Sequence, residues 1–182
     1  MLRLSDNPPM VHPAEALVAA MPGRWRVGHT KARFEKAFAW DLLRRDIAYF
    51  LPLLTRVRVS GGKKRRVLMP VFPSYVFFCG GDDARLAALT TNRLCQVIEV
   101  ADQRQIVAEL AAVQQALAGE AELDPYPFAA AGRRCRVTAG PFQGLEGIVA
   151  SRANVTRLVL QVSILGQGAA MEIDADLLEP VD

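Results

Sequence analysis

Four consecutive cations, Lys63, Lys64, Arg65 and Arg66, follow the glycine pair at positions 61 and 62. A Gly-Gly pair between two β-forming segments predicts a tight turn, so these side chains would project from a hairpin tip. Clustered lysine and arginine side chains bind phosphates, which gives affinity and position without sequence recognition. We therefore expect this loop to contact a nucleic-acid backbone; the alternative is a solvated hairpin tip. Lys31, Arg33 and Lys36 form a second candidate patch, for which an ordinary polar helix face is an equal alternative.

Aromatic residues dominate the segment that follows the basic loop. Phe72 and Tyr75 flank Pro73, which cannot donate a ladder hydrogen bond and places its strand at an edge or breaks it there. A hydrophobic strand edge left open is usually an interaction site. We therefore expect Phe72, Pro73 and Tyr75 to bind a protein partner. His29 is expected beside this face, and Phe77 is equally well explained as part of the core.

No set of residues suggests catalysis, a metal site or a phosphate-binding glycine loop. The two histidines, His12 and His29, are far apart in sequence. Cys79, Cys95 and Cys135 are odd in number and widely spaced, which fits neither a disulfide framework nor a zinc site. We expect three small buried hydrophobic residues, no cofactor and no enzymatic activity.

The elements that would position these residues follow from hydrophobic periodicity. In the first half they alternate in the order β-α-β-β-α-β-α, which is the ferredoxin-like arrangement. The expected elements are a strand at 25–30, a helix at about 34–45, strands at 47–59 and 66–78, a helix from 82 to about 91, a strand at 95–100 and a helix at about 102–117.

The second half is predicted to be all β, and the fold class is therefore α+β. Short strands are expected at 135–138, 148–151, 157–165 and 171–173, and their close spacing suggests a small closed barrel. Strand alternation places Ile164 with Leu158, Leu160 and Val162 on the core face, and leaves Leu165 on the other face.

Charge divides the 182 residues in the same way. Residues 24–118 contain 16 Lys or Arg and 8 Asp or Glu, a net charge of +8, whereas residues 131–182 contain 5 and 6, a net charge of −1. We expect the basic domain to meet a polyanion. Residues 1–23 are expected to form a flexible tail with a short helix at 14–21, and residues 119–130 an acidic linker. With no signal peptide or membrane span expected, the predicted location is the cytoplasm.

Two separate segments carry a family resemblance. The first comprises Trp25, His29-Thr30-Lys31, Glu35-Lys36, Phe50-Leu51-Pro52-Leu53 and the run from Pro70 to Phe77, and it resembles the N-terminal domain of NusG transcription factors. The second comprises residues 132–137 and 140–149 and is similar to a KOW motif, which forms an SH3-like barrel. Ser163-Ile164-Leu165-Gly166 resembles the third-strand signature of the NusG barrel.

The resemblance implies a monomeric factor that stays bound to RNA polymerase during elongation and suppresses pausing and termination. The family's N-terminal domain docks on the clamp helices of the largest catalytic subunit, beside upstream or non-template DNA. The KOW domain recruits Rho, a small-subunit ribosomal protein, or both. On this basis Phe72, Pro73, Tyr75, His29 and Phe77 would bind polymerase.

For the barrel, the resemblance and the near-neutral charge favour a protein partner over RNA. We expect Phe142, Ile164 and Leu165 to bind it, with Leu165 as the exposed anchor.

The sequence is compatible with two branches of the family, the general NusG proteins and the specialised antiterminators. General NusG proteins usually have Phe-Phe-Pro-Gly-Tyr where this chain has Val71-Phe72-Pro73-Ser74-Tyr75. The segments 29–36 and 50–53 look more like the specialised RfaH and UpxY antiterminators, and we favour that branch. The alternatives are a housekeeping NusG that couples to Rho and, from another class, a ribosome- or RNA-binding KOW protein without a polymerase role.

Overall fold

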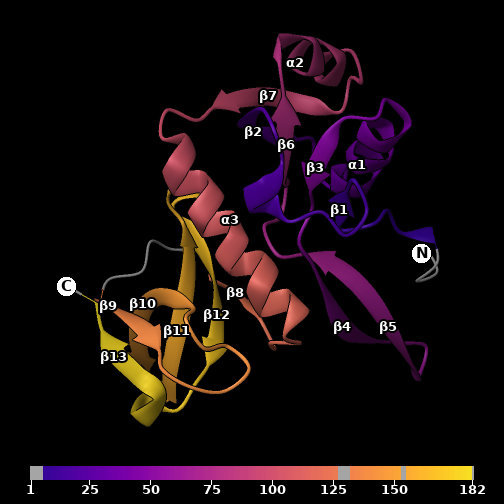
Figure 1. Cartoon of the computed structure of the whole chain (residues 1–182). Helices are drawn as coiled ribbons and strands as arrows, with labels where there is room; N and C mark the ends of the chain where they lie inside the picture. The colour runs from indigo at the N-terminus through magenta and orange to yellow at the C-terminus, as the bar shows by residue number, and fades with distance from the viewer. Residues whose placement is uncertain (1–5, 127–131, 153–154, 182) are drawn as a thin grey trace. The chain divides into compact units, whose positions relative to one another are not determined.

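The computed structural model describes residues 6–126, 132–152 and 155–181. Its contacts divide the chain into two compact units, Met1–Gln103 and Arg104–Asp182 (Figure 1). This division falls just after the first residue of the last long helix, α3 (Gln103–Ala118), whereas the domains predicted from the sequence divide after the helix.

The first unit is built on a five-stranded antiparallel sheet with the order β1-β3-β6-β2-β7. Four of these strands, β3, β6, β2 and β7, have the ferredoxin-like order that the sequence predicts. Two helices complete the unit. The bounds are β1 Val11–His12, β2 Arg24–Thr30, α1 Glu35–Arg44, β3 Ala48–Phe50, β6 Tyr75–Gly80, α2 Asp82–Leu89 and β7 Leu94–Glu99.

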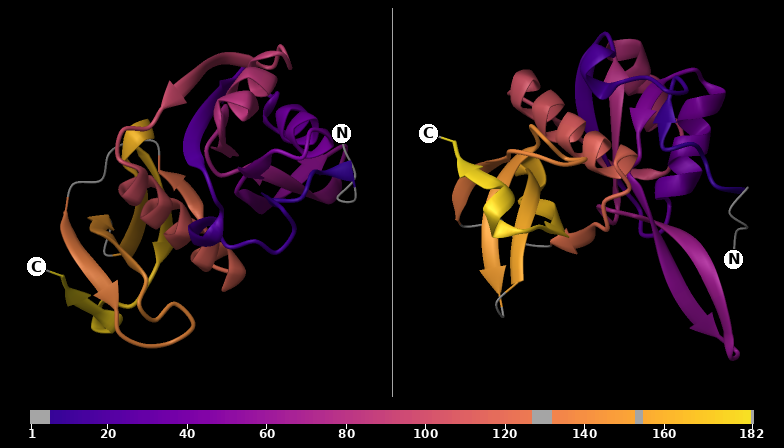
Figure 2. Two further views of the ribbon diagram at one scale, coloured as in Figure 1. Left: turned by 45° about the horizontal axis from the view of Figure 1, so that its top comes forward. Right: turned by 60° about the horizontal axis from the view of Figure 1, so that its bottom comes forward.

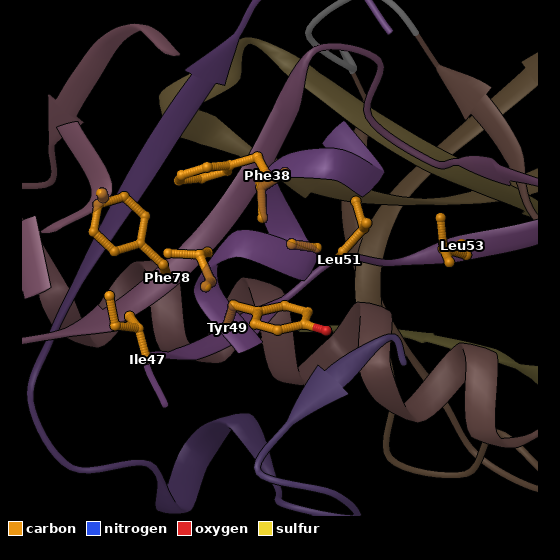
Figure 3. Packing of buried hydrophobic residues seen from close by; sticks show 10 residues of the cluster. Phe38, Ile47, Tyr49, Leu51, Leu53 and Phe78 are labelled. Carbon is orange, nitrogen blue, oxygen red and sulfur yellow. The ribbon is translucent and has the colours of Figure 1, made fainter. Parts of the chain in front are cut away.

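The core of this unit forms where α1 packs on the sheet. Phe38 and Leu42 lie one turn apart on α1 and are fully buried, as the helical spacing predicts. The Phe38 ring meets the Phe78 ring edge to face, with 6.1 Å between ring centroids (Figure 3). Tyr49 and Leu51, from β3 and the residues after it, join the same cluster. This packing fixes the central strand, β6, beneath the helix.

The segment before β2 is not a flexible tail in its described part, residues 6–23. Its strand β1 pairs with β3, so that Val11 lies opposite Phe50. The phenol of Tyr49 donates to the carbonyl of Pro9 at 2.9 Å, and burial raises the pKa of Tyr49. In place of the expected helix at 14–21 there is one 3-10 turn, Val18–Ala20. The prediction was wrong because these contacts use the main chain, which leaves no periodic pattern in the sequence.

A two-stranded hairpin separates β3 from β6. It comprises β4 (Leu53–Ser60) and β5 (Lys63–Pro70), which form a sheet of their own. The segment predicted as one strand over 66–78 is therefore broken, as its two prolines allow. The second part, β6, is the central strand of the large sheet, so of the two alternatives, an edge strand or a break at Pro73, the structure shows the break.

The second unit contains α3 and six antiparallel strands with the order β13-β9-β10-β11-β12-β8. Helical spacing predicts one apolar stripe on α3, formed by Ile106, Leu110, Val113 and Leu117. The first three are buried and Leu117 is half-buried. In β11 the side chains of Leu158, Leu160 and Val162 are buried, but so is Val159 on the other face. The bounds are β8 Asp124–Tyr126, β9 Arg133–Val137, β10 Glu146–Arg152, β11 Val155–Val162, β12 Gln167–Glu172 and β13 Leu178–Pro180.

The predicted acidic linker contains one of these strands. Asp124, Pro125 and Tyr126 form β8 and pair with β12, and Leu123 is buried just before them. Proline is tolerated because β8 lies at the edge of the sheet. Residues 127–131, the remainder of that linker and the predicted start of the barrel, lie outside the described residues.

Candidate nucleic-acid and protein interfaces

The β4–β5 hairpin extends away from the five-stranded sheet of its own unit (Figures 1 and 2). Its base is anchored, because Leu53 and Leu54 are buried and Leu68 packs against the core. Beyond the base, residues 57–59 and 61–66 are exposed. Residues 53–70 contain six Lys or Arg and no Asp or Glu. The hairpin is therefore a projecting arm whose charged side chains are all positive.

The register of the hairpin sorts its side chains onto two faces, because directly opposed residues of an antiparallel pair lie on the same face. Arg58 lies opposite Arg65. Val57 lies opposite Arg66, and Val59 lies opposite Lys64, on the other face. Both valines are unusually open to solvent, with exposed fractions of 60% and 67%. Cations thus occur on both faces, and the two exposed valines accompany them on one.

The structure adds Arg56 and Arg58 to the basic loop predicted from the sequence. They lie on β4, opposite Val67 and Arg65 of β5. The predicted group, Lys63 to Arg66, was contiguous in sequence, and these two arginines join it only through strand pairing. Once the Gly-Gly turn is assigned, counting residues outward from it gives this pairing, so the signal was present in the sequence.

The second candidate patch does not form a continuous basic surface. Lys31 donates through Nζ to the main-chain oxygen of Asn92 at 2.9 Å. Lys36 donates through Nζ to the main-chain oxygen of Leu68 at 2.6 Å, and burial lowers the pKa of this lysine. Of the three cations, Arg33 is the one whose side chain is exposed and makes no hydrogen bond or ion pair with the described residues. Lys36 instead ties α1 to the base of the basic arm.

A tight turn joins the arm to β6 and carries the predicted aromatic face. The main-chain N–H of Tyr75 donates to the carbonyl of Phe72 at 3.2 Å, Pro73 is the second residue, and Ser74 has a φ of 68°. These features are typical of a type II turn, whose third position favours glycine. Serine therefore stands here in a conformation that glycine adopts with less strain.

Three of the five residues predicted for this face are accessible. Pro73 is exposed, and Tyr75 and His29 are half-buried. The last two lie opposite each other on β6 and β2, and their rings stack with 5.0 Å between centroids. The stacked rings of His29 and Tyr75, together with the exposed Pro73, form the surface that we call the aromatic step.

The expectation that Phe72 lies open at a strand edge was wrong. Phe72 is 1% exposed, and its ring meets that of Phe77 edge to face at 5.8 Å between centroids. Phe77 is itself fully buried, in agreement with its alternative assignment to the core. These two buried rings pack against each other inside the unit, so they are not part of the exposed surface of the turn.

The residues predicted to bind a partner of the barrel, Phe142, Ile164 and Leu165, lie in the second unit. The exposure of Ile164 and Leu165 differs from the prediction. Strand β11 ends at Val162, and residues Ser163–Leu165 form a 3-10 helix that Gly166 ends with a φ of 60°. Strand alternation therefore does not extend to this segment. Ile164 is 40% exposed, so its predicted place in the core was wrong, and Leu165, predicted as the exposed anchor, is half-buried.

Helix α3 holds this 3-10 turn in place. Ser163 donates to the carboxylate of Glu109 through its main-chain N–H at 3.0 Å and through its hydroxyl at 2.6 Å. The half-buried Phe142 lies beside Gly119, just after the helix, so close that a Cβ on this glycine would be 2.6 Å from the ring. No local pattern in the sequence indicates the role of Glu109, because its partner is more than fifty positions away.

Two further features bear on the class of protein. Within the described part of the chain, no three His, Cys, Asp or Glu residues gather as metal ligands would. Among the described helices, none has the length and apolar character that crossing a bilayer requires.

Comparison with known protein families gives a match that extends from just before β2 to just after α3. The family model described as "Transcription termination factor nusG" matches residues 23–122. A search of curated protein sequences gave no match. Among solved structures, the chain is similar to one described as "Domain interaction in Thermotoga maritima NusG", at 16% identity and a TM-score of 0.45, over 90% of this chain and 99% of that one. The family model covers more than half of the 182 residues, and the chain belongs to the NusG family of transcription factors.

Proposed function

We propose that this protein binds RNA polymerase through its first unit and acts during elongation as a specialised antitermination factor. The observation that carries the proposal is the family match over residues 23–122, which contain the ferredoxin-like sheet, the basic arm and the aromatic step. The protein acts by binding rather than by catalysis. The first unit provides the polymerase contact and the second unit recruits a further protein.

The polymerase contact centres on the step formed by His29, Pro73 and Tyr75. Stacked rings beside an exposed proline offer a rigid apolar surface, and rigid aromatic residues often carry much of an interface's energy. Phe72 and Phe77 contribute indirectly, since their packed rings hold the turn in shape. The surface is suited to the clamp helices of the largest catalytic subunit, which is the docking site implied by the resemblance.

A binding assay with the full-length chain and RNA polymerase tests this contact. We expect Tyr75→Ala to weaken binding at least about tenfold, corresponding to about 1.4 kcal/mol. Tyr126→Ala, which removes a half-buried tyrosine from β8 in the second unit, is the matched control and should bind normally. Equal affinity for the wild type and a folded Tyr75→Ala variant would show that this face is not the docking site.

The basic arm provides a nucleic-acid contact within the elongation complex, to upstream or non-template DNA. Its support is the exposed run Lys63 to Arg66 together with Arg58 on the opposing strand. Alanine at Lys64 and Arg65 should flatten the salt dependence of binding by about 0.9 for each duplex phosphate that the variant no longer neutralises.

The specialised role is favoured over the housekeeping role by residues around the aromatic step. Ser74 occupies the positive-φ position where the general NusG pattern has glycine, so this turn departs from that pattern at its most constrained residue. Mapping chromosomal occupancy distinguishes the two. Occupancy confined to one or a few operons is expected, whereas occupancy of most transcription units would establish a general NusG that couples to Rho.

The second unit recruits its partner, a small-subunit ribosomal protein or Rho, through Phe142, Ile164 and Leu165. Ile164 is the most exposed of the three and is therefore the proposed anchor. We expect Ile164→Asp to abolish binding of the ribosomal protein without unfolding the barrel. An NMR titration of the full-length chain measures this. Binding that survives the substitution, or unchanged signals around Phe142, would place the partner elsewhere.

A further inference from the structure

We propose that the β4–β5 arm enters a groove of B-form DNA as a two-stranded ribbon and contacts phosphates of both DNA strands, one with each face. This inference deepens the nucleic-acid contact proposed above and rests on it. It differs from one-sided docking, in which a single face of the arm lies along the outside of the duplex. The residues that carry it are Arg58, Lys64, Arg65 and Arg66.

The charge distribution of the arm points to an anionic ligand. Arg58 and Arg65 are directly opposed, and like charges in this position destabilise a hairpin. No acidic side chain within residues 53–70 offsets the repulsion. Within the hairpin Arg58 makes one weak hydrogen bond, to the sulfur of Met69 at 3.6 Å. A polyanion that binds the cations would relieve the repulsion between them.

The placement of the cations on two faces points to a groove. Arg58 and Arg65 lie on one face, and Lys64 and Arg66 lie on the other. A flat phosphate surface would meet only one of these pairs. A groove has a phosphate backbone on each side, and the major groove of B-DNA is about 12 Å wide and accepts a two-stranded β-ribbon. Both pairs can then bind phosphate at once.

The dimensions of the arm are sufficient for this. Each strand has eight residues, and at about 3.3 Å per residue a strand of this length spans roughly 26 Å. The base is fixed by the bond from Lys36 to the carbonyl of Leu68, so the exposed end is presented in a defined direction.

The side chains of the arm favour a DNA duplex over other nucleic acids. Proteins that bind single strands stack the bases on aromatic rings, and residues 53–70 contain no aromatic side chain. The major groove of an RNA duplex is deep and too narrow for side chains to enter.

The test uses the full-length chain with a short DNA duplex and no polymerase, so that its failure is distinct from failure of the polymerase contact. Binding is measured by fluorescence anisotropy between about 50 and 200 mM salt. Two double variants remove one pair each: Arg58→Ala with Arg65→Ala, and Lys64→Ala with Arg66→Ala. Each should flatten the dependence of log affinity on log salt by about 1.8, which is 0.9 per phosphate contact.

A third double variant, Arg104→Ala with Arg133→Ala, removes the same net charge from exposed positions outside the arm. It should leave the slope at the wild-type value, which controls for a general loss of positive charge. All three variants should keep the wild-type circular dichroism spectrum, because the altered side chains are exposed.

The competing arrangements give different results. A reduced slope for only one of the two arm variants would establish docking by one face and overturn groove insertion. Equal or tighter binding to a single strand, or to an RNA duplex of the same sequence, would overturn the assignment to B-DNA. Unchanged slopes in both arm variants would show that the arm does not bind DNA at all.

Discussion

The carboxylate of Glu35 accepts a hydrogen bond from the main-chain N–H of Ser74, with 2.6 Å between nitrogen and oxygen. Glu35 is the first residue of α1 and is nearly buried, so this bond ties the helix to the turn that carries Pro73 and Tyr75. Removing the acceptor should leave a donor unsatisfied, which typically costs about 1–3 kcal/mol. We predict a loss of this size for Glu35→Ala and a smaller loss for Glu35→Gln, which retains an acceptor oxygen. Urea unfolding measures both, and a Glu35→Ala protein as stable as the wild type would refute the prediction.

The turn residue itself offers a second prediction. Ser74 has a positive φ, which costs a residue with a Cβ about 1–2 kcal/mol relative to glycine. The greater freedom of glycine in the unfolded chain offsets about 0.4–1 kcal/mol of this. Ser74→Gly should therefore raise the free energy of unfolding by up to about 1.6 kcal/mol, whereas Ser74→Val should lower it. A Ser74→Gly variant that unfolds at a lower urea concentration than the wild type would contradict this account.

The aromatic residues on either side of Pro73 should behave differently in stability measurements. Phe72→Ala should lower the free energy of unfolding by about 3–5 kcal/mol, because it removes a buried ring that packs on Phe77. Tyr75→Ala should cost less, since it removes a half-buried ring and a stacking contact worth about 0.5–1.5 kcal/mol. Parallel thermal unfolding of the two variants decides this. Similar losses in both would show that the two rings are equally important to the fold.

The three cysteines should differ in reactivity. All three were expected to be buried, but Cys95 is exposed on β7, whereas Cys79 and Cys135 are buried. A thiol reagent should label Cys95 rapidly in the folded protein and the other two only after unfolding. Mass spectrometry of the labelled peptides identifies each site. Rapid labelling of Cys79 in the folded protein would contradict its burial.

Cys79 also predicts a pH effect on stability. Burial raises the pKa of its thiol from 9.0 to about 11, although the nearby Arg26 opposes the shift. The unfolded chain loses this proton at lower pH than the folded chain does. The stabilisation is therefore complete below about pH 9 and is lost as pH rises toward 11. The stability difference between wild type and Cys79→Ala should decrease over this range, and a constant difference would refute the shift.

Local patterns in the sequence predicted most of the first unit and the helix α3 of the second unit. The helical spacing of Phe38 and Leu42, the Gly-Gly turn and the stripe on α3 all arise from contacts within or beside one element. Such patterns involve residues that are close together in the sequence, so they can be recognised before the fold is known. The strand order followed because the ferredoxin-like arrangement is the one expected for that series of elements.

The errors came from contacts between distant residues or from changes of backbone conformation. Strand β1 pairs through its main chain with residues almost forty positions away, and β8 contains a proline that argued against a strand. The orientation of Ile164 depended on where β11 ends, which the 3-10 turn before Gly166 determines. The exposure of Phe72 depended on Phe77, which reaches it only after the chain has turned at Pro73.

The position of β2 has a consequence for folding during synthesis. This strand is among the first made, yet both of its neighbours, β6 and β7, come much later in the chain. While the chain leaves the ribosome, β2 therefore has no partner until residues 75–80 emerge and has only one until residues 94–99 follow. The β4–β5 arm needs only its own eighteen residues and can form first. We expect the arm to appear early on the nascent chain, while the sheet from which it extends is completed later, as β6 and then β7 emerge.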